Sequence, residues 1–414
     1  MDSILNKCLR KENVMNHQQP CIAIDVSKGN SHVCGFTKAG YPYQKVLKIT
    51  HNQKGFETLS ELYHMINRDT QQVPVFIFEA TGIYHRPLKN FLETRHYPFI
   101  EASPLLAAKH RKNSTIRSAK TDARDTQALA RLFYDVDFQL NRISDETFYE
   151  LRQCHRYYTQ LTEILVKCKV HFNEKLDILF PEFRNEVTQA VYANYYLELL
   201  KKYPHPDLLA KARVDTIQNL LVKHGKRASS SRKNAEHLKE FSQKCWSGSS
   251  PTSVDTMILV NYIEQIQQYQ QQRDNVIKQM ISLGKDYQLY QQLQSIPGIG
   301  RTIAICLIAE LGDLSNFDSR KQLLAYAGLD PVISQSGQRD GKGLSISKKG
   351  NKHLRRLLFL VVTSSVHISQ DHPIQQFYQK KRQNLPNKAA LIASSDKLLR
   401  TIFRMSQTGE NYLF

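Results

Sequence analysis

Four acidic residues in the N-terminal third of the chain have the types and the spacing of a metal site. Asp25 and Glu79 each come at the end of a short apolar run that favours a β-strand, and strand ends on one edge of a sheet lie close together. Asp122 and Asp125 are three residues apart at the start of a predicted helix, so their side chains lie on one face of it. Four carboxylates this close repel one another unless divalent cations neutralise them, and two cations roughly 4 Å apart are typical of phosphodiester chemistry. We therefore expect a Mg²⁺ or Mn²⁺ site.

Each of the four acids also has a structural explanation when it is taken alone. Asp122 and Asp125 could stabilise the helix dipole from the first turn. Asp25 could be a turn residue, and Glu79, which precedes Ala-Thr-Gly, could cap the next helix. The joint arrangement is what favours metal binding over these explanations.

An α/β domain would position these acids. From Cys21 to about Leu140, short apolar runs alternate with helical patterns. The expected strands cover residues 21–26, 32–36, 43–49 and 73–78, and the expected helices cover residues 55–66, 84–93 and 122–133. Cations precede the acidic pair and could hold a nucleic-acid strand, leaving the acids free for metal; they are His110, Arg111, Lys112, Arg117 and Lys120.

Two stretches in the middle of the chain repeat apolar residues every seven positions, which is typical of a coiled coil. The first has Leu151, Tyr158, Leu165, Phe172 and Leu179 on one seam position and Cys154, Leu161 and Cys168 on the other. The second has Leu259, Ile266 and Met280 on one and Tyr262, Tyr269, Val276 and Leu283 on the other. The two helices could form a hairpin or pair between protomers. The basic, Ser-rich stretch 223–250 between them favours a loop or an adaptable insertion.

A third unit starts near Ser295. Residues 295–300, Ser-Ile-Pro-Gly-Ile-Gly, precede an apolar helix at 302–311 and resemble the turn of a helix-hairpin-helix motif. Gly298 and Gly300 would let backbone amides approach a phosphate, although a plain helix-joining turn explains them equally well. The basic run 347–356 suits phosphate contacts or a solvated helix start, and its cations are Lys348, Lys349, Lys352, Arg355 and Arg356. Residues 387–405 predict a basic amphipathic helix that packs on this unit.

The composition favours a polyanionic partner. The chain has 57 Lys plus Arg against 38 Asp plus Glu, a formal charge of +19. A membrane partner is disfavoured because no apolar run approaches the roughly 20 residues of a span. No signal peptide is visible, so we expect a cytoplasmic protein that associates with nucleic acid. Seven cysteines without a CxxC pair and fifteen histidines without an HExxH motif indicate reduced thiols and no zinc site.

Several motifs together resemble one family, the DEDD transposases of insertion sequence IS110, including its IS1111 subgroup. In the N-terminal third the resemblance rests on Ala-Ile-Asp-Val-Ser-Lys at 23–28, Phe-Glu-Ala-Thr-Gly-Ile-Tyr at 78–84, Lys-Thr-Asp-Ala-Arg-Asp at 120–125 and Ala-Leu-Ala at 128–130. In the C-terminal third it rests on Ile-Pro-Gly-Ile-Gly at 296–300, Ala-Gly-Leu-Asp-Pro at 327–331, Gln-Ser-Gly at 335–337 and the basic run 346–356. Each motif is short, so the resemblance to the family depends on the order and spacing of the motifs along the chain.

The resemblance implies an architecture and a reaction. After a polar tail at 1–20, it implies an α/β RNase H-like (RuvC-like) catalytic domain at 21–145. A helical coiled-coil region at 146–290 and a mainly α C-terminal transposase domain at 291–414 would follow. Asp25, Glu79, Asp122 and Asp125 correspond to the family's metal-binding acids, and Ser336 corresponds to a serine nucleophile. The partners implied are double-stranded donor and target DNA and a structured non-coding guide (bridge) RNA encoded beside the gene.

Ser336 is chosen by the family motif and not by spacing, because Ser334, Ser345 and Ser347 lie close to it in sequence. Taken alone, a serine beside glycine in a polar loop is usually a turn residue. No general base accompanies it locally, so the metal site would have to activate it. We therefore expect domain docking or a homo-oligomer, a dimer or a tetramer.

Two other functions fit the same residues. A RuvC-like nuclease acting on branched DNA would use the four carboxylates and water, without a serine intermediate. A non-catalytic nucleic-acid-binding protein would use the acids only structurally. The first alternative predicts cut ends without a protein adduct, and the second predicts no product that depends on divalent metal.

Overall fold

The structure is a computed structural model of the 414-residue chain. It describes residues 17–114, 122–136, 138, 146–187, 190–331, 345–368 and 372–412. The chain divides into two compact units, residues 1–144 and 145–414, and each is described by itself.

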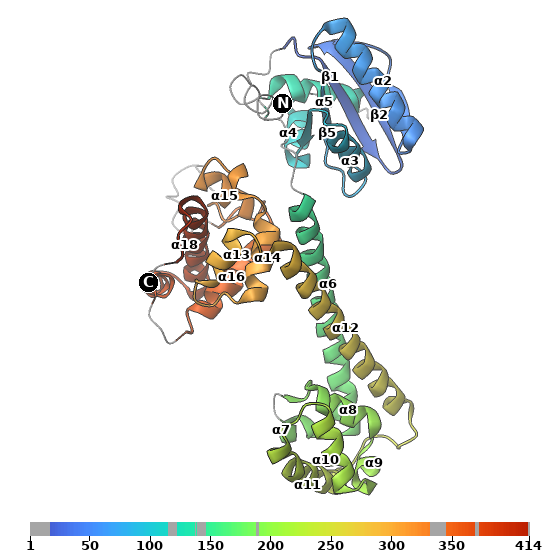
Figure 1. Cartoon of the computed structure of the whole chain (residues 1–414), viewed down its shortest axis with the longest axis vertical. Helices are drawn as coiled ribbons and strands as arrows, with labels where there is room; N and C mark the ends of the chain where they lie inside the picture. Colours follow the sequence, from blue (N-terminus) through green and yellow to red (C-terminus); the bar gives the residue numbers. More distant parts are fainter. Residues whose placement is uncertain are drawn as a thin grey trace. The chain divides into compact units, whose positions relative to one another are not determined.

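The N-terminal unit is built on a mixed sheet (Figure 1). Its strands are β1 (Cys21–Ser27), β2 (Asn30–Lys38), β3 (Tyr41–Pro42), β4 (Leu47–Thr50), β5 (Val75–Glu79) and β6 (Phe99–Ala102). They lie in the order β3-β2-β1-β5-β6, and β4 also pairs with β2. β1 is antiparallel to β2 and parallel to β5, which is parallel to β6. β1 and β5 are apolar along most of their length because both of their faces are covered.

Helices pack on both faces of this sheet. They are α2 (Gln53–Thr70), α3 (Arg86–Thr94), α4 (Pro104–Ser114) and α5 (Asp122–Asp135). On one face, Ile22 and Phe76 pack with residues of α2 and α3. On the other, Ala23 and Ile77 pack with α5 residues such as Phe133; we call this the α5 face. The sheet and the helices around it thus form two hydrophobic layers.

Most elements predicted for this unit are confirmed within a few residues. The exception is the strand predicted at 43–49, where the structure has two short strands, β3 and β4, that both pair with β2. The sequence prediction also missed β6 and α4. β6 has only four residues, Phe-Ile-Glu-Ala, too few to display an alternating pattern.

In the described part of the second unit, the regular secondary structure is helical, apart from one isolated β-bridge. The helices are α6 (Glu146–Leu179), α7 (Phe183–Val187), α8 (Asn194–Lys202), α9 (Pro206–Lys211), α10 (Val214–Lys223), α11 (Ala228–Lys244), α12 (Val254–Gly284), α13 (Gln288–Gln294), α14 (Arg301–Leu311), η2 (Leu314–Asn316), α15 (Arg320–Ala327), α16 (Lys352–Ser365), α17 (Pro373–Arg382) and α18 (Asn387–Thr408). No helix in the described ranges is long and apolar enough to cross a membrane.

The two long helices, α6 and α12, pack on each other as an antiparallel hairpin (Figure 1). Lys175 Nζ, near the end of α6, lies 2.6 Å from Asp255 Oδ1, near the start of α12. At the other end, Gly284 lies against Leu151. Of the two arrangements that the heptads left open, the chain therefore has the hairpin.

Five short helices, α7 to α11, pack on the end of this hairpin where α6 ends and α12 begins. We call residues 183–253 the tip bundle. Of the two expectations for residues 223–250, the loop is wrong for most of its length, because α11 covers residues 228–244. Whether the stretch is an adaptable insertion stays a prediction. α11 was not predicted because its buried face shows no hydrophobic period. Three of its four buried residues have small side chains: Ser231, Ala235 and Ser242.

The C-terminal helices, α13 to α18, pack around α14 on the other end of the hairpin. Residues 304–311 of α14 are all buried. The helix predicted at 302–311 and the tail helix predicted at 387–405 are both confirmed, as α14 and α18. α18 buries Leu398, Leu399 and Ile402 against this bundle.

Candidate active site

Asp25 and Glu79 lie at one edge of the sheet and on one face. Ile24 of β1 pairs in parallel with Phe78 of β5, and the two acids are the next residues of these strands. Side chains alternate between faces along a strand. Ala23 and Ile77, two residues earlier, point to the α5 face, so Asp25 and Glu79 share that face.

The direction of α5 brings its first turn to the same edge. Near the end of α5, the Tyr134 hydroxyl donates to the carbonyl of Gln19, just before β1 begins, at 2.9 Å. α5 therefore runs antiparallel to β1. From Cys21 to Asp25 the strand rises about 13 Å, and from Tyr134 back to Asp125 the helix rises about the same distance. Asp125 thus comes level with Asp25.

Asp122 is the first residue of α5, but its side chain is not among those that the structure describes. Asp125 is half-buried. Among the described side chains, no three His, Cys, Asp or Glu residues are grouped closely enough to hold a metal ion. The fold thus brings Asp25, Glu79 and the first turn of α5 to one edge, and the metal coordination itself stays a prediction.

Arg111 supplies a positive charge beside these acids. Its Nη1 lies 2.8 Å from Glu79 Oε2, and the two side chains are 38% and 20% exposed. Arg111 was predicted to contact nucleic acid, and in this structure it pairs with an acid of the candidate site. Lys112 follows it on α4, with its side chain outside the described ones, and Arg117 and Lys120 lie outside the described residues.

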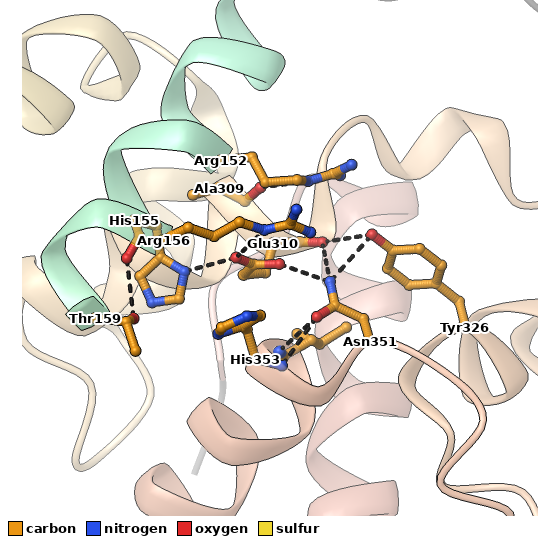
Figure 2. A network of polar contacts seen from close by, with 10 residues as sticks. Arg152, His155, Arg156, Thr159, Ala309, Glu310, Tyr326, Asn351 and His353 are labelled. Carbon is orange, nitrogen blue, oxygen red and sulfur yellow. Dashed lines mark hydrogen bonds and ion pairs between the residues drawn. The ribbon is translucent and has the colours of Figure 1, made fainter. Parts of the chain in front are cut away.

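A second carboxylate centre lies inside the C-terminal bundle (Figure 2). Glu310 of α14 is fully buried, and its Oε1 lies 2.7 Å from Nδ1 of His155 on α6. Nδ2 of Asn351 donates to Glu310 Oε2 at 2.7 Å, and Arg156 Nε lies 3.9 Å from Oε1. The Tyr326 hydroxyl donates to the backbone carbonyl of Glu310 at 3.0 Å. Both carboxylate oxygens are therefore engaged within the protein.

The surroundings of Glu310 shift the pKa of two groups. Burial raises the pKa of the Glu310 carboxyl, but hydrogen bonds from His155 and Asn351 and the charges of His155 and Arg156 outweigh it, so the pKa lies below its ordinary value. Burial lowers the pKa of His353, although the charge of Glu310 opposes this. Glu310 therefore remains a carboxylate at neutral pH despite complete burial.

Asn351 connects this centre to the basic helix α16. Its side-chain oxygen accepts from the backbone amides of His353 at 3.0 Å and Leu354 at 3.2 Å, which caps α16. Its backbone amide donates to the carbonyl of Tyr326 at 2.6 Å. α6, α14, α15 and α16 thus meet at one buried polar cluster.

Ser336 belongs to residues 332–344, which lie outside the described residues. The two ends of this segment are held together. Pro331 and Ile346 form an antiparallel bridge, and the Ser347 hydroxyl donates to Asp330 Oδ1 at 2.5 Å. The chain carrying the predicted nucleophile therefore leaves from and returns to one place, next to the start of α16.

The cations predicted at this point divide into two groups. Lys348, Lys349 and Lys352 are exposed around the start of α16. Arg355 instead donates to the carbonyl of Ala327 at 2.9 Å, and Arg356 lies 3.8 Å from Glu163 of α6. Arg355 is thus engaged within the fold, whereas Arg356 forms an ion pair whose two side chains are 57% and 63% exposed. The phosphate contacts predicted for the three lysines stay a prediction.

The two glycines predicted to approach phosphate also differ. Gly298 has a φ of +89° and packs against Ser365, whose hydroxyl donates to the carbonyl of Pro297 at 2.5 Å. Gly300 precedes α14 with open space around it, and no side chain caps that helix. Gly298 therefore shapes the turn, and Gly300 leaves the start of α14 accessible.

Two family models match the chain. A DEDD-type IS110 transposase model matches residues 22–181, and the model described as the transposase IS116/IS110/IS902 family matches residues 290–379. The chain belongs to the IS110 family of DEDD transposases. It is therefore an enzyme of an insertion sequence whose substrate is DNA, and the first IS110 match contains Asp25, Glu79, Asp122 and Asp125.

Individual relatives include a gene-inverting protein and proteins of insertion sequences. The pilin gene-inverting protein of Moraxella lacunata is 25% identical over 92% of this chain and 93% of its own length. The transposase for insertion sequence element IS1111A of Coxiella burnetii is 44% identical over 16% of this chain and 18% of its own. An IS110 protein of Streptomyces coelicolor is 27% identical over 34% of this chain and 35% of its own.

Sequence reasoning missed Glu310, His155 and Asn351. Glu310 is an acidic residue inside the otherwise apolar run 303–311 of an IS110-family helix. A carboxylate in such a run must either reach solvent or find a buried partner. That rule could have singled out Glu310, but not its partner His155, 155 residues away in sequence.

Proposed function

We propose that this IS110 transposase is a metal-dependent recombinase that cuts and rejoins DNA through a serine intermediate. The observation that carries the proposal is the convergence of Asp25, Glu79 and the first turn of α5 on one edge of the sheet. Neighbouring acids that share a face have the donor chemistry that Mg²⁺ and Mn²⁺ prefer.

The proposal includes an RNase H-like (RuvC-like) arrangement for the N-terminal unit. Three antiparallel strands, β1 to β3, followed by the parallel strands β5 and β6 on the other side of β1, support it. In such a sheet, acids at the end of the central strand β1 and of its neighbour β5 face the helix that packs across them.

Asp25, Glu79, Asp122 and Asp125 would hold the metal. Bound there, divalent cations supply charge stabilisation for the attacking and leaving oxygens of a phosphodiester. Glu79 must then exchange the hydrogen bond that Arg111 donates. Arg111 can turn toward a DNA phosphate, because its side chain is 38% exposed.

Ser336 is the proposed nucleophile. Its hydroxyl oxygen forms a bond to a DNA phosphorus, its proton is released, and the strand's own oxygen leaves as a hydroxyl. The phosphoester conserves the energy of the broken phosphodiester, so a second strand's hydroxyl can displace the serine without an external energy source. Lys348, Lys349 and Lys352 would hold the adjacent phosphates.

The proposed partners are double-stranded DNA, a structured guide RNA and further copies of the chain. The +19 charge favours polyanions in general, which include both DNA and RNA. Ser336 and the acids belong to different units, so a second protomer could supply one of them. The inverting relative fits the same chemistry, because inversion of a DNA segment requires rejoining of its cut ends.

The decisive experiment separates recombinase from nuclease. Purified protein, its RNA and donor DNA are incubated with Mg²⁺ and run on denaturing gels to detect a protein–DNA adduct. Ser336→Ala should abolish both adduct and recombined product, whereas Ser334→Ala should retain both. Cut ends without an adduct in the wild type would favour the nuclease, and product formation that survives chelation of divalent metal would remove the metal site.

The role of RNA is tested separately. Extracts that support recombination are treated with ribonuclease before donor and target DNA are added. Loss of recombined product, restored by adding the transcript of the flanking non-coding region, is expected. Unchanged recombination after treatment would show that the protein reads DNA directly.

A further inference from the structure

A concave, cationic pocket lies in the tip bundle, outside both sequence ranges that match the family models. It has a volume of about 490 Å³ and is lined by the ends of α8 and α10. Its ionisable lining residues are Glu198, Lys201, Lys202, Lys223 and His224, and Thr216 and Asn219 add polar groups. Its lining residues all lie between positions 198 and 224 of the chain.

Positive charge remains in this pocket after its ion pairs are assigned. Lys201 lies 2.9 Å from Glu264, and the lone lining acid, Glu198, accepts a hydrogen bond from Gln267 at 2.7 Å. Lys202 and Lys223 are exposed, and neither has an acidic partner within 4 Å among the described residues. Their ammonium groups are therefore available to an anion.

The backbone at the end of α10 does not oppose an anion strongly. The carbonyls of Leu220, Val222 and Leu221 accept hydrogen bonds from the amides of residues 224, 225 and 226. Helix C-termini repel anions through such carbonyls when they are unsatisfied. Here they are engaged, so the lysines dominate the local charge.

The neighbouring aromatic rings do not offer a stacking surface. Lys226 Nζ lies 4.8 Å from the ring centre of Tyr195 and 4.9 Å from that of Tyr196, and it donates to the Tyr196 hydroxyl. Lys202 lies over the Tyr203 ring at 5.4 Å. Proteins that bind single strands stack bases on exposed rings. The rings here are covered by cations, which favours a ligand read through its phosphates.

We propose that this pocket binds the phosphodiester backbone of a nucleic-acid duplex. The tip bundle as a whole has twelve Lys and Arg against six Asp and Glu, so the pocket lies in a basic surrounding that attracts a polyanion. Such a contact adds affinity without sequence preference.

The test compares two double variants of the full-length protein. Lys202→Ala/Lys223→Ala removes the two exposed pocket lysines. Lys211→Ala/Lys233→Ala is the matched control, because it removes two exposed lysines of the same bundle that do not line the pocket. Binding to labelled double-stranded DNA, double-stranded RNA and single-stranded DNA of equal length is measured by fluorescence anisotropy at several salt concentrations, without divalent metal.

The pocket variant should lose duplex affinity, and the slope of log K against log salt should become shallower by about 2, because each duplex phosphate contact contributes about 0.9. The control should change this slope by much less. The DNA and RNA arms identify which duplex the pocket holds. Equal changes in both variants, an unchanged slope in the pocket variant, or a loss confined to single strands would each overturn the proposal. Because no cleavage is measured, the result is independent of the proposed metal and serine chemistry.

Discussion

Two carboxylate centres lie among the described residues, one in each compact unit, and they differ in how their charge is balanced. Glu79 keeps 20% of its side chain exposed and pairs with an arginine that is itself 38% exposed. Glu310 has no exposed side-chain surface, and its partner His155 is only 4% exposed. Glu79 can exchange Arg111 for a ligand that arrives from solvent. Glu310 can bond only to the protein groups that enclose it. Burial thus separates an acid that a ligand could still reach from one that is enclosed by the fold.

The largest effect should follow from neutralising the exposed centre. Asp25→Asn removes one charge from the edge where Asp25, Glu79 and α5 meet while it keeps the shape of the side chain. Metal stabilisation is worth several kcal/mol, so DNA cleavage should fall by at least about 10³-fold. Cleavage is measured on labelled donor DNA with Mg²⁺. The thermal midpoint and DNA binding should stay close to those of the wild type.

Glu57→Gln is a suitable control for that experiment. Glu57 lies exposed on α2, on the opposite face of the sheet from α5, and should tolerate the change with full activity. If Asp25→Asn cleaves DNA at the wild-type rate, Asp25 matters no more for cleavage than Glu57 does. That result would contradict the assignment of Asp25 to the metal site.

The second largest effect should appear in stability and not in metal-dependent chemistry. His155→Ala leaves the Glu310 carboxylate buried without its partner at Oε1, 2.7 Å away, and breaking a buried pair in this way costs about 3–5 kcal/mol. The matched control is His171→Ala on the same helix, because His171 bonds the exposed Glu174 at 3.1 Å. That change should cost no more than about 0.5 kcal/mol.

Chemical denaturation of each variant measures the free energy of unfolding. A similar, small loss for His155→Ala and His171→Ala would show that Glu310 does not depend on His155. Asn351 and Arg156 would then have to stabilise the negative charge of the Glu310 carboxylate.

The two centres also differ in how far the sequence predicted them. Asp25 and Glu79 could be predicted because each ends an apolar run, and a strand of that kind is recognisable from local sequence. The parallel pairing of β1 with β5 that sets them side by side depends on folding and has no local signature. The same holds for Arg111, which meets Glu79 across 32 residues, and for the cluster around Glu310.

Secondary-structure prediction failed where the sequence has no hydrophobic periodicity. β6 was missed because four residues show no period, and α11 was taken for a loop because its buried face is made largely of serine and alanine. In both cases tertiary packing decides the structure. The heptads of α6 and α12 predicted two long helices but left hairpin and intermolecular pairing open, since the same apolar seam serves either partner.

A smaller effect should come from removing the competing cation of the exposed centre. Arg111 occupies Glu79 Oε2, which a metal would have to share or take over. An exposed ion pair is worth about 0–1 kcal/mol, so Arg111→Ala should strengthen Mn²⁺ binding by no more than about fivefold. Calorimetric titration with Mn²⁺ measures this, with Lys109→Ala, an exposed cation of the same helix, as control. Weaker Mn²⁺ binding in Arg111→Ala would show that Arg111 orients Glu79 and does not compete for it.

The smallest effect concerns the pH dependence of the buried centre. The pKa of Glu310 lies below its ordinary value of 4.5, because the hydrogen bonds and charges of His155, Asn351 and Arg156 outweigh burial. A carboxyl with a lowered pKa in the folded state contributes stability that is fully present above the unfolded pKa and is lost as the pH falls through the folded one. The wild type should therefore lose more stability than Glu310→Gln when the pH falls from 5 toward 3, and the gap between them should narrow. His353 and Cys306 also face Glu310, and the charge of Glu310 raises the pKa of both groups. Glu310→Gln removes that contribution, so the gap between the two proteins includes it. Denaturant unfolding of both proteins at a series of pH values measures the gap, and a gap that stays constant or widens on acidification would mean that Glu310 is not held as a carboxylate.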